Sequence, residues 1–216
     1  MLGYLLFIMT ENTNMPFVYI LIFILSMIPV ALIVMLIFRI RKLREILNTL
    51  AIQRNGNATK GNIFFYPVLT FYHGNNKIEV YSRSGQIRSR HYASPPYTYV
   101  KVKLANPIEQ DFRVFKQDMV LKIGKILGMQ DITIGADHFD EEVIIKATDE
   151  SFIKNILTTS IQDRLLTIIE KYKAHVYLYK NTLSIDVPDI IYKEEEYNDL
   201  IDTTIQIVKK ITGEEF

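Results

Sequence analysis

Residues 15–38, MPFVYILIFILSMIPVALIVMLIF, contain no charged side chain. A helix of about 20 apolar residues spans the hydrocarbon core of a bilayer, and this stretch is slightly longer. A helix that is apolar on every side is stable only in a membrane or in the centre of a large protein. The rest of the chain is too small and too polar to bury such a helix. The sequence therefore predicts a transmembrane helix at residues 15–38.

The charges beside this helix predict its orientation. The apolar run is longer than that of a signal peptide, and the residues before it contain Glu11 but no lysine or arginine. Basic side chains follow it at once, at Arg39, Arg41, Lys42 and Arg44. Because cytoplasmic flanks are enriched in Lys and Arg, we expect residues 1–14 outside and the domain in the cytoplasm, anchored in the inner membrane. The same basic residues also suit anionic headgroups of the bilayer.

The composition limits the classes of function. The chain has 25 basic and 24 acidic residues, without the basic excess of nucleic-acid-binding domains, so no nucleic-acid partner is predicted. It contains no cysteine, which excludes disulfides, zinc–thiolate sites and a cysteine nucleophile. No cofactor is predicted. We interpret residues 39–60 as a basic juxtamembrane helix and linker, and residues 61–216 as one soluble domain of ordinary size.

Hydrophobic periodicity predicts the fold of this domain. Beyond residue 63 the helical spacing of apolar residues gives way to alternation, which is typical of half-buried strands. Strands are predicted at 68–73, 77–82, 97–104, 112–116, 143–147, 174–179 and 182–186. Helices are predicted at 119–127, after an Asp149 cap, at 161–172 and at 194–211. This order predicts an α+β domain with a mainly antiparallel sheet.

Residues 132–146, ITIGADHFDEEVIIK, are followed by Asp149 and by residues 157–166, LTTSIQDRLL. This segment resembles a family of uncharacterised bacterial single-pass membrane-anchored proteins, in which a G-D-x-x-F-D strand motif precedes a helix with a Leu-Thr-rich end. Here Gly135-Ala136-Asp137 replaces the Gly-Asp pair. The resemblance implies an anchor followed by an α+β domain over residues 51–216. It implies no activity and no catalytic residue.

One acidic segment contains a dense group of potential metal ligands: Asp137, His138, Asp140, Glu141 and Glu142. Histidine and carboxylates bind hard or borderline cations, and His73 or His91 are further candidates. The alternative is a solvated loop in which Phe139 anchors the core and Asp140 accepts hydrogen bonds from the local turn. The metal hypothesis leads to an alternative function, a membrane-tethered metal-dependent hydrolase.

A basic loop at residues 82–90 contains candidate phosphate-binding residues: Arg83, Arg88, Arg90 and the adjoining His91. These residues suit a phosphate, from a headgroup of the nearby bilayer, a nucleotide or RNA, and a loop kept soluble by its charge is the alternative. Tyr92, Tyr97 and Tyr99 form either an aromatic platform or an ordinary strand surface. We interpret His175, among apolar strand residues, as a core histidine.

No nucleophile motif or phosphate-binding glycine loop is present, so no catalytic residue is assigned. The sequence therefore predicts a non-enzymatic membrane-anchored protein whose cytoplasmic domain binds a partner or the membrane surface. The partners expected from it are the lipid bilayer and either a protein partner or a second copy of the chain.

Overall fold

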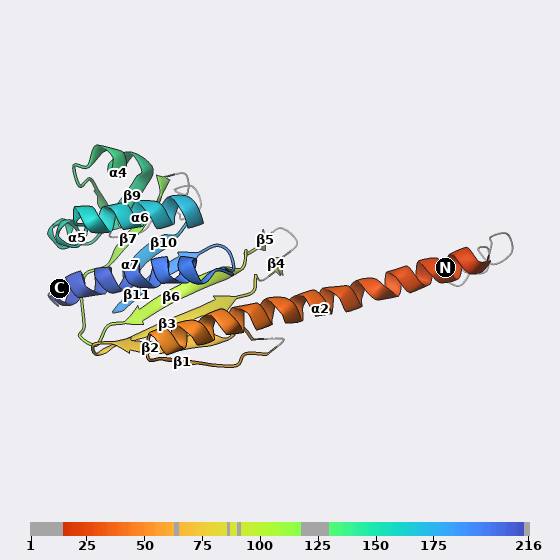
Figure 1. Cartoon of the computed structure of the whole chain (residues 1–216). Coiled ribbons are helices and arrows are strands. Elements are labelled where there is room, and N and C mark those ends of the chain that lie inside the picture. The colour runs from red at the N-terminus through yellow and green to blue at the C-terminus, as the bar shows by residue number, and fades with distance from the viewer. Residues whose placement is uncertain (1–14, 63–64, 86, 90–91, 118–129, 214–216) are drawn as a thin grey trace. The chain divides into compact units, whose positions relative to one another are not determined.

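The computed structural model describes residues 15–62, 65–85, 87–89, 92–117 and 130–213. The chain divides into two compact units, residues 1–42 and 43–216 (Figure 1). Helix α2, Met15–Gln53, begins in the first unit and ends in the second. By length and composition it is the one described helix suited to crossing a membrane, with a mean hydropathy of 3.1 in its most apolar window. Its apolar side chains point outward, and Phe23 is 65% exposed.

The second unit is built on a nine-stranded sheet in the order β1-β2-β3-β6-β11-β10-β7-β9-β8. All neighbouring strands are antiparallel. The strands are β1 Asn57–Ala58, β2 Val68–His73, β3 Asn76–Arg83, β6 Tyr97–Lys103, β7 Phe112–Lys116, β8 Gln130–Ile132, β9 Val143–Ala147, β10 His175–Tyr179 and β11 Thr182–Val187. Strands β4 Ile87–Ser89 and β5 Tyr92–Ala93 form a separate hairpin.

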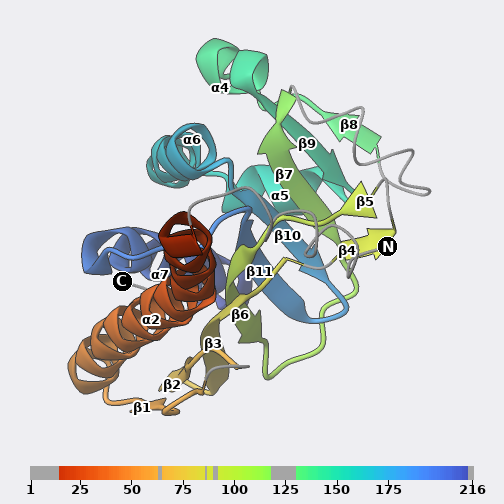
Figure 2. The ribbon, with the colours of Figure 1, turned by 90° about the vertical axis from the view of Figure 1, so that its right-hand side faces the viewer.

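Helices pack on one face of this sheet. They are the end of α2, α4 Asp137–Glu142, α5 Glu150–Ile156, α6 Thr159–Tyr172 and α7 Glu194–Thr212. Figure 2 views the strands with α6 and α7 on one side of them. The helices bury their apolar sides against one continuous core, because alternate residues of the strands point toward them. The fold is therefore α+β with an antiparallel sheet, as the sequence predicts.

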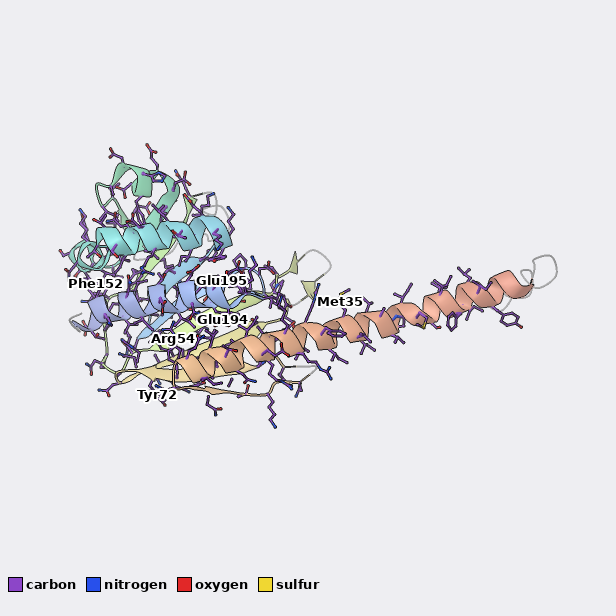
Figure 3. All side chains as sticks on the ribbon, viewed as in Figure 1. Met35, Arg54, Tyr72, Phe152, Glu194 and Glu195 are labelled. Atoms are coloured by element: carbon purple, nitrogen blue, oxygen red, sulfur yellow. The ribbon has the colours of Figure 1, made fainter. Side chains whose placement is uncertain are left out.

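The end of α2 belongs to this core. Leu43, Leu47 and Leu50 are fully buried in it, at the helical spacing of three and four residues. Arg54 forms a 2.7 Å ion pair with Asp202 of α7, and Figure 3 labels Arg54 beside that helix. The compact domain thus begins at residue 43, inside the segment that the sequence assigns to a juxtamembrane helix.

Buried hydroxyl groups connect α7 to the sheet. Tyr197 is fully buried, and its hydroxyl donates to the carbonyl of Ile191 at 3.3 Å. The Tyr197 hydroxyl also lies 3.4 Å from the Ser82 hydroxyl, which lies 3.2 Å from that of Thr98. Burial raises the pKa of Tyr197 to about 12. The first turn of α7 is therefore held against β3 and β6 by a satisfied polar network.

Most of the predicted elements are confirmed within about two residues. Asp149 caps α5 by accepting the Phe152 N–H at 2.9 Å, as its position predicts. Lys180 and Asn181 form the β10–β11 turn with φ values of 46° and 63°, the left-handed pair that a two-residue hairpin requires.

Three short elements differ from the prediction. Residues 137–142, expected as a loop, form α4, and the linker residues 57–58 pair with β2 as an edge strand. Strand β8 has three residues, too few for an alternation signal. The predicted helix at residues 119–127 lies outside the described residues.

Candidate functional site

The second face of the sheet carries tyrosines where the first carries aliphatic residues. We call it the tyrosine face, defined by Tyr81, Tyr97, Tyr99 and Tyr177. Alternation directs these side chains away from the packed core, and none of the helices in the described part of the chain lies over them. The register brings the four residues together, because Tyr81 pairs with Tyr99 and the strand of Tyr177 is two strands further along.

Three of these tyrosines form a continuous stack. The rings of Tyr81 and Tyr99 lie 5.0 Å apart at 26°, and those of Tyr97 and Tyr99 lie 5.8 Å apart at 28°. The Lys101 ammonium lies 4.9 Å from the centre of the Tyr99 ring, within the range of a cation–π interaction. The stack is thus preformed, with a cation held on it.

A half-exposed acid lies next to the stack. Asp186 accepts hydrogen bonds from the hydroxyls of Ser184 and Tyr177, the latter at 3.1 Å. Burial raises the pKa of Asp186, although Ser184, Lys101 and Tyr177 oppose the shift. For Lys101, burial lowers the pKa, but hydrogen bonding to Tyr81 and the charges nearby give a net increase. The lysine therefore stays charged while the carboxyl is easier to protonate than a free one.

Arg113 extends this polar surface onto β7. Its guanidinium lies 5.9 Å from the centre of the Tyr177 ring, the residue with which it pairs across the strands. Within the described residues, the Arg113 Nε is a buried donor without a hydrogen-bond acceptor. An unpaired buried donor is uncommon in folded proteins. This part of the tyrosine face therefore has a donor that could still bind an acceptor.

A pocket of about 440 Å³ adjoins the stack at the end of β3. Its lining includes Phe65, Tyr66, Tyr81 and Arg83. Arg83 is exposed and pairs with Tyr97 across the strands. This pocket combines aromatic walls with one guanidinium, a set of groups suited to an anion attached to an apolar body.

The basic residues that the sequence singled out do not form one cluster among the described residues. Arg83 lies at this pocket, while Arg88 belongs to β4, and Arg90 and His91 lie outside the described residues. Of the membrane-proximal group, Arg39, Arg41 and Lys42 are exposed on α2. Arg44 is half-buried and donates from Nε to the carbonyl of Lys60 at 2.6 Å.

The acidic segment has a structural explanation. Asp140 accepts the backbone N–H groups of Ile134, Gly135 and Ala136, the Gly135 bond measuring 2.8 Å. Phe139 is 2% exposed and belongs to the core. Asp137, His138 and Glu141 are exposed on α4, and the described residues contain no group of three His, Asp or Glu side chains placed to hold a metal ion. The metal-dependent hydrolase therefore gains no support from the described part of the chain.

The position of one histidine corrects the sequence interpretation. His175 is half-buried and lies on the tyrosine face, opposite Asp186, and not in the core. The alternation in β10 already pointed to this, because His175 shares its side of the strand with Tyr177 and Tyr179 while Val176 and Leu178 are buried. Sequence reasoning also missed Lys101, Asp186 and Arg113, since their proximity depends on the register of strands far apart in sequence.

Comparisons with known proteins give a likeness of fold. No protein-family model matches the sequence, and no curated protein matches it significantly. A solved structure with a similar fold is the crystal structure of the mycobacterial trehalose monomycolate transport factor A, TtfA. It aligns with a TM-score of 0.54 over 79% of this chain and 95% of that chain, with 8% identical residues. The two chains therefore share a fold.

Proposed function

We propose that the chain is a membrane-anchored, non-enzymatic accessory protein whose domain binds a protein partner through the tyrosine face. The observation that carries this proposal is the stack of Tyr81, Tyr99 and Tyr97 with Lys101 held on it. Aromatic residues are enriched at protein interfaces because they supply a large contact area and have few rotatable bonds. Since these rings are already packed together, binding through them orders few side chains.

The charges around the stack match the anatomy of an interface. A typical interface has an aromatic or apolar centre and a polar rim. Here Glu79 and Arg83 from β3 and Lys103 from β6 lie on the same face as the stack. Polar residues at the rim favour a partner with complementary charges and suppress others, so they contribute to specificity more than to affinity.

We assign the domain to the cytoplasmic side of an inner membrane. Arg39, Arg41 and Lys42 follow the apolar stretch, and the residues before it contain no basic side chain. We also propose that the chain belongs to the family of uncharacterised bacterial membrane-anchored proteins that it resembles. The name of the structural neighbour, a transport factor, is consistent with a non-catalytic role. Because α2 is suited to crossing a membrane, we propose that the partner is itself a membrane protein.

Cross-linking from the tyrosine face tests the partner. A photoreactive residue replaces Tyr97 in the full chain expressed in cells, and a control probe replaces Glu170, which is exposed on α6. We expect a discrete cross-linked membrane protein from position 97 and none from position 170. In a second sample, Lys101→Gln should weaken the cross-link at position 97, because it removes the cation held on the stack. Equal products from both positions, or a product indifferent to Lys101→Gln, would contradict the proposal.

Protease protection tests the side of the membrane. The full chain carries a tag after its last residue, and intact spheroplasts are treated with external protease. We expect the tag to survive until the membrane is broken, because the basic flank holds the domain inside. Degradation in intact spheroplasts would place the domain outside and require a partner in the cell envelope.

A further inference from the structure

A loop next to β2 exposes an aromatic side chain to solvent. Phe65 is 70% exposed, and two hydrogen bonds with Asn62 hold its backbone in place. The Phe65 N–H donates to the Asn62 side-chain oxygen at 2.9 Å, and the Asn62 N–H donates to the Phe65 carbonyl at 2.7 Å. The turn depends on Gly61, whose φ is +60° and where a Cβ would lie 2.7 Å from the Pro67 nitrogen. The exposure of Phe65 is therefore built into the loop by these contacts.

Phe65 forms one wall of the pocket at the end of β3. Tyr66 and Val68 line the pocket beside it, and Arg83 and Ser84 supply a guanidinium and a hydroxyl. Among the described residues, no carboxylate forms an ion pair with Arg83. A guanidinium binds phosphate through charge-assisted hydrogen bonds, and the aromatic walls suit the carbon chain attached to that phosphate.

The loop is tied to the part of α2 that follows the apolar stretch. Arg44 holds the carbonyl of Lys60, the residue before Gly61, at 2.6 Å. Arg44 follows Phe38, the last residue of the apolar stretch, by six positions in the sequence. The residue that holds the pocket loop is therefore six positions along the chain from the predicted end of the membrane-spanning segment.

We infer that this pocket binds the phosphate of an anionic phospholipid in the bilayer that holds α2. Arg83 binds the phosphate, Ser84 adds a hydrogen-bond donor, and Phe65 enters the interfacial layer beside the acyl chains. The lipid orients the domain at the membrane surface. The inference rests on the loop and pocket and does not depend on the protein partner proposed for the tyrosine stack.

Photoreactive lipids test this site. The full chain is reconstituted in phosphatidylcholine vesicles that contain a trace of either phosphatidylglycerol or phosphatidylcholine with a diazirine near the headgroup. After illumination, lipid adducts are mapped by mass spectrometry and normalised to adducts within residues 15–38. We expect adducts at Phe65 and Tyr66 from the phosphatidylglycerol probe in clear excess over those from the phosphatidylcholine probe. Equal labelling by the two probes would overturn the inference.

Variants of the pocket provide the controls. Arg83→Gln should lower the phosphatidylglycerol adducts roughly fivefold, the contribution of about one basic residue at an anionic surface. Lys103→Gln is the matched control, because Lys103 is also exposed but lies six residues along β6 from Tyr97, about 20 Å from the pocket. If the two substitutions lowered the adducts equally, the lipid would be attracted by general surface charge and not bound at the pocket, which would overturn the inference. If soluble glycerol phosphate, added before illumination, prevented the adducts, the pocket would bind a free phosphate ester. That result would overturn the assignment to a phospholipid.

Discussion

The sheet has two unlike faces: the covered face, on which the helices pack, and the tyrosine face. Burial determines the residue types of the covered face more strictly than those of the tyrosine face. On the covered face one row of paired residues crosses eight strands and is entirely apolar: Leu69, Val80, Val100, Ile185, Val176, Val114, Ile145 and Ile132. One position along each strand, on the tyrosine face, the paired row is entirely polar: Thr70, Glu79, Lys101, Ser184, Tyr177, Arg113, Lys146 and Asp131.

This difference shows which face is shaped by folding alone. The apolar row gains its free energy from burial, so any aliphatic residue of suitable volume fits there. The tyrosine face includes half-buried groups that need specific partners. Asp186 accepts a hydrogen bond from the Tyr177 hydroxyl, and the Arg113 Nε has no acceptor among the described residues. Folding does not require such residues in the middle of a sheet face, because Thr or Val would serve there at lower desolvation cost. We therefore expect the residues of the tyrosine face to be there because they bind a partner.

The largest contrast should come from two adjacent residues of β11. Ile185 and Ser184 are both fully buried but point to opposite faces. Ile185→Ala should lower the free energy of unfolding by about 3 kcal/mol, because it leaves a cavity in the core. Ser184→Ala should cost about 1 kcal/mol, since it loses one hydrogen bond to Asp186. Urea denaturation of the full chain in detergent, followed by circular dichroism, measures both. Equal costs would mean that the two faces are packed alike and would break the comparison.

The covered face was the more predictable one from sequence. Alternating apolar residues in β2, β3, β6 and β9 are visible without a structure, and the helical spacing of Leu43, Leu47 and Leu50 predicted that the helix continues past the anchor. What the pattern could not give is that these leucines enter the same core as the sheet. That depends on packing between segments far apart in the sequence, which local periodicity does not encode.

The tyrosine face was predictable only in part. Arg83 was a candidate as part of a basic loop. Tyr97 and Tyr99 were candidates as an alternating aromatic series, for which an ordinary strand surface was the alternative. Lys101 was not singled out, although it continues the same alternation by one step. Asp186 lies more than eighty residues from Tyr99, and only the register of β11 against β6 makes them neighbours. Polar residues on one strand therefore identify a surface, but the site requires the strand order.

The hydroxyl network on the covered face gives the next largest effect. Tyr197→Phe should cost about 1 kcal/mol at pH 8, because it removes the bonds to Ile191 and Ser82. Burial raises the Tyr197 pKa to about 12, so above pH 10 the unfolded state loses its proton first and the wild-type stability falls. Phenylalanine lacks this loss. The difference between the two proteins should therefore shrink from pH 8 to pH 11 in urea titrations, and a constant difference would show that the hydroxyl is not buried.

A smaller effect in the same direction, at lower pH, is expected at Asp186. Burial raises its pKa, so the folded state keeps the proton at a pH where the unfolded state has released it. Wild-type stability contributed by this group is therefore complete below the unfolded pKa and is lost as the pH rises through the folded pKa. Asp186→Asn still accepts a hydroxyl hydrogen bond and does not titrate. It should be relatively more stable than the wild type at pH 7 than at pH 4. Parallel unfolding curves at the two pH values would show that Asp186 is solvated.

The smallest change in stability should accompany the largest change in binding. Tyr97 is half-buried at the end of the stack, so Tyr97→Ser should alter the free energy of unfolding by no more than about 0.5 kcal/mol. A photoreactive probe at Tyr81 should nevertheless lose most of its cross-link to the partner, because a few aromatic residues carry much of the binding energy of an interface. Tyr179→Ser is the control, since Tyr179 is exposed on the same face but outside the stack. If Tyr97→Ser destabilised the domain by as much as Ile185→Ala, the tyrosines would be part of the folding core, and the distinction between the two faces would fail.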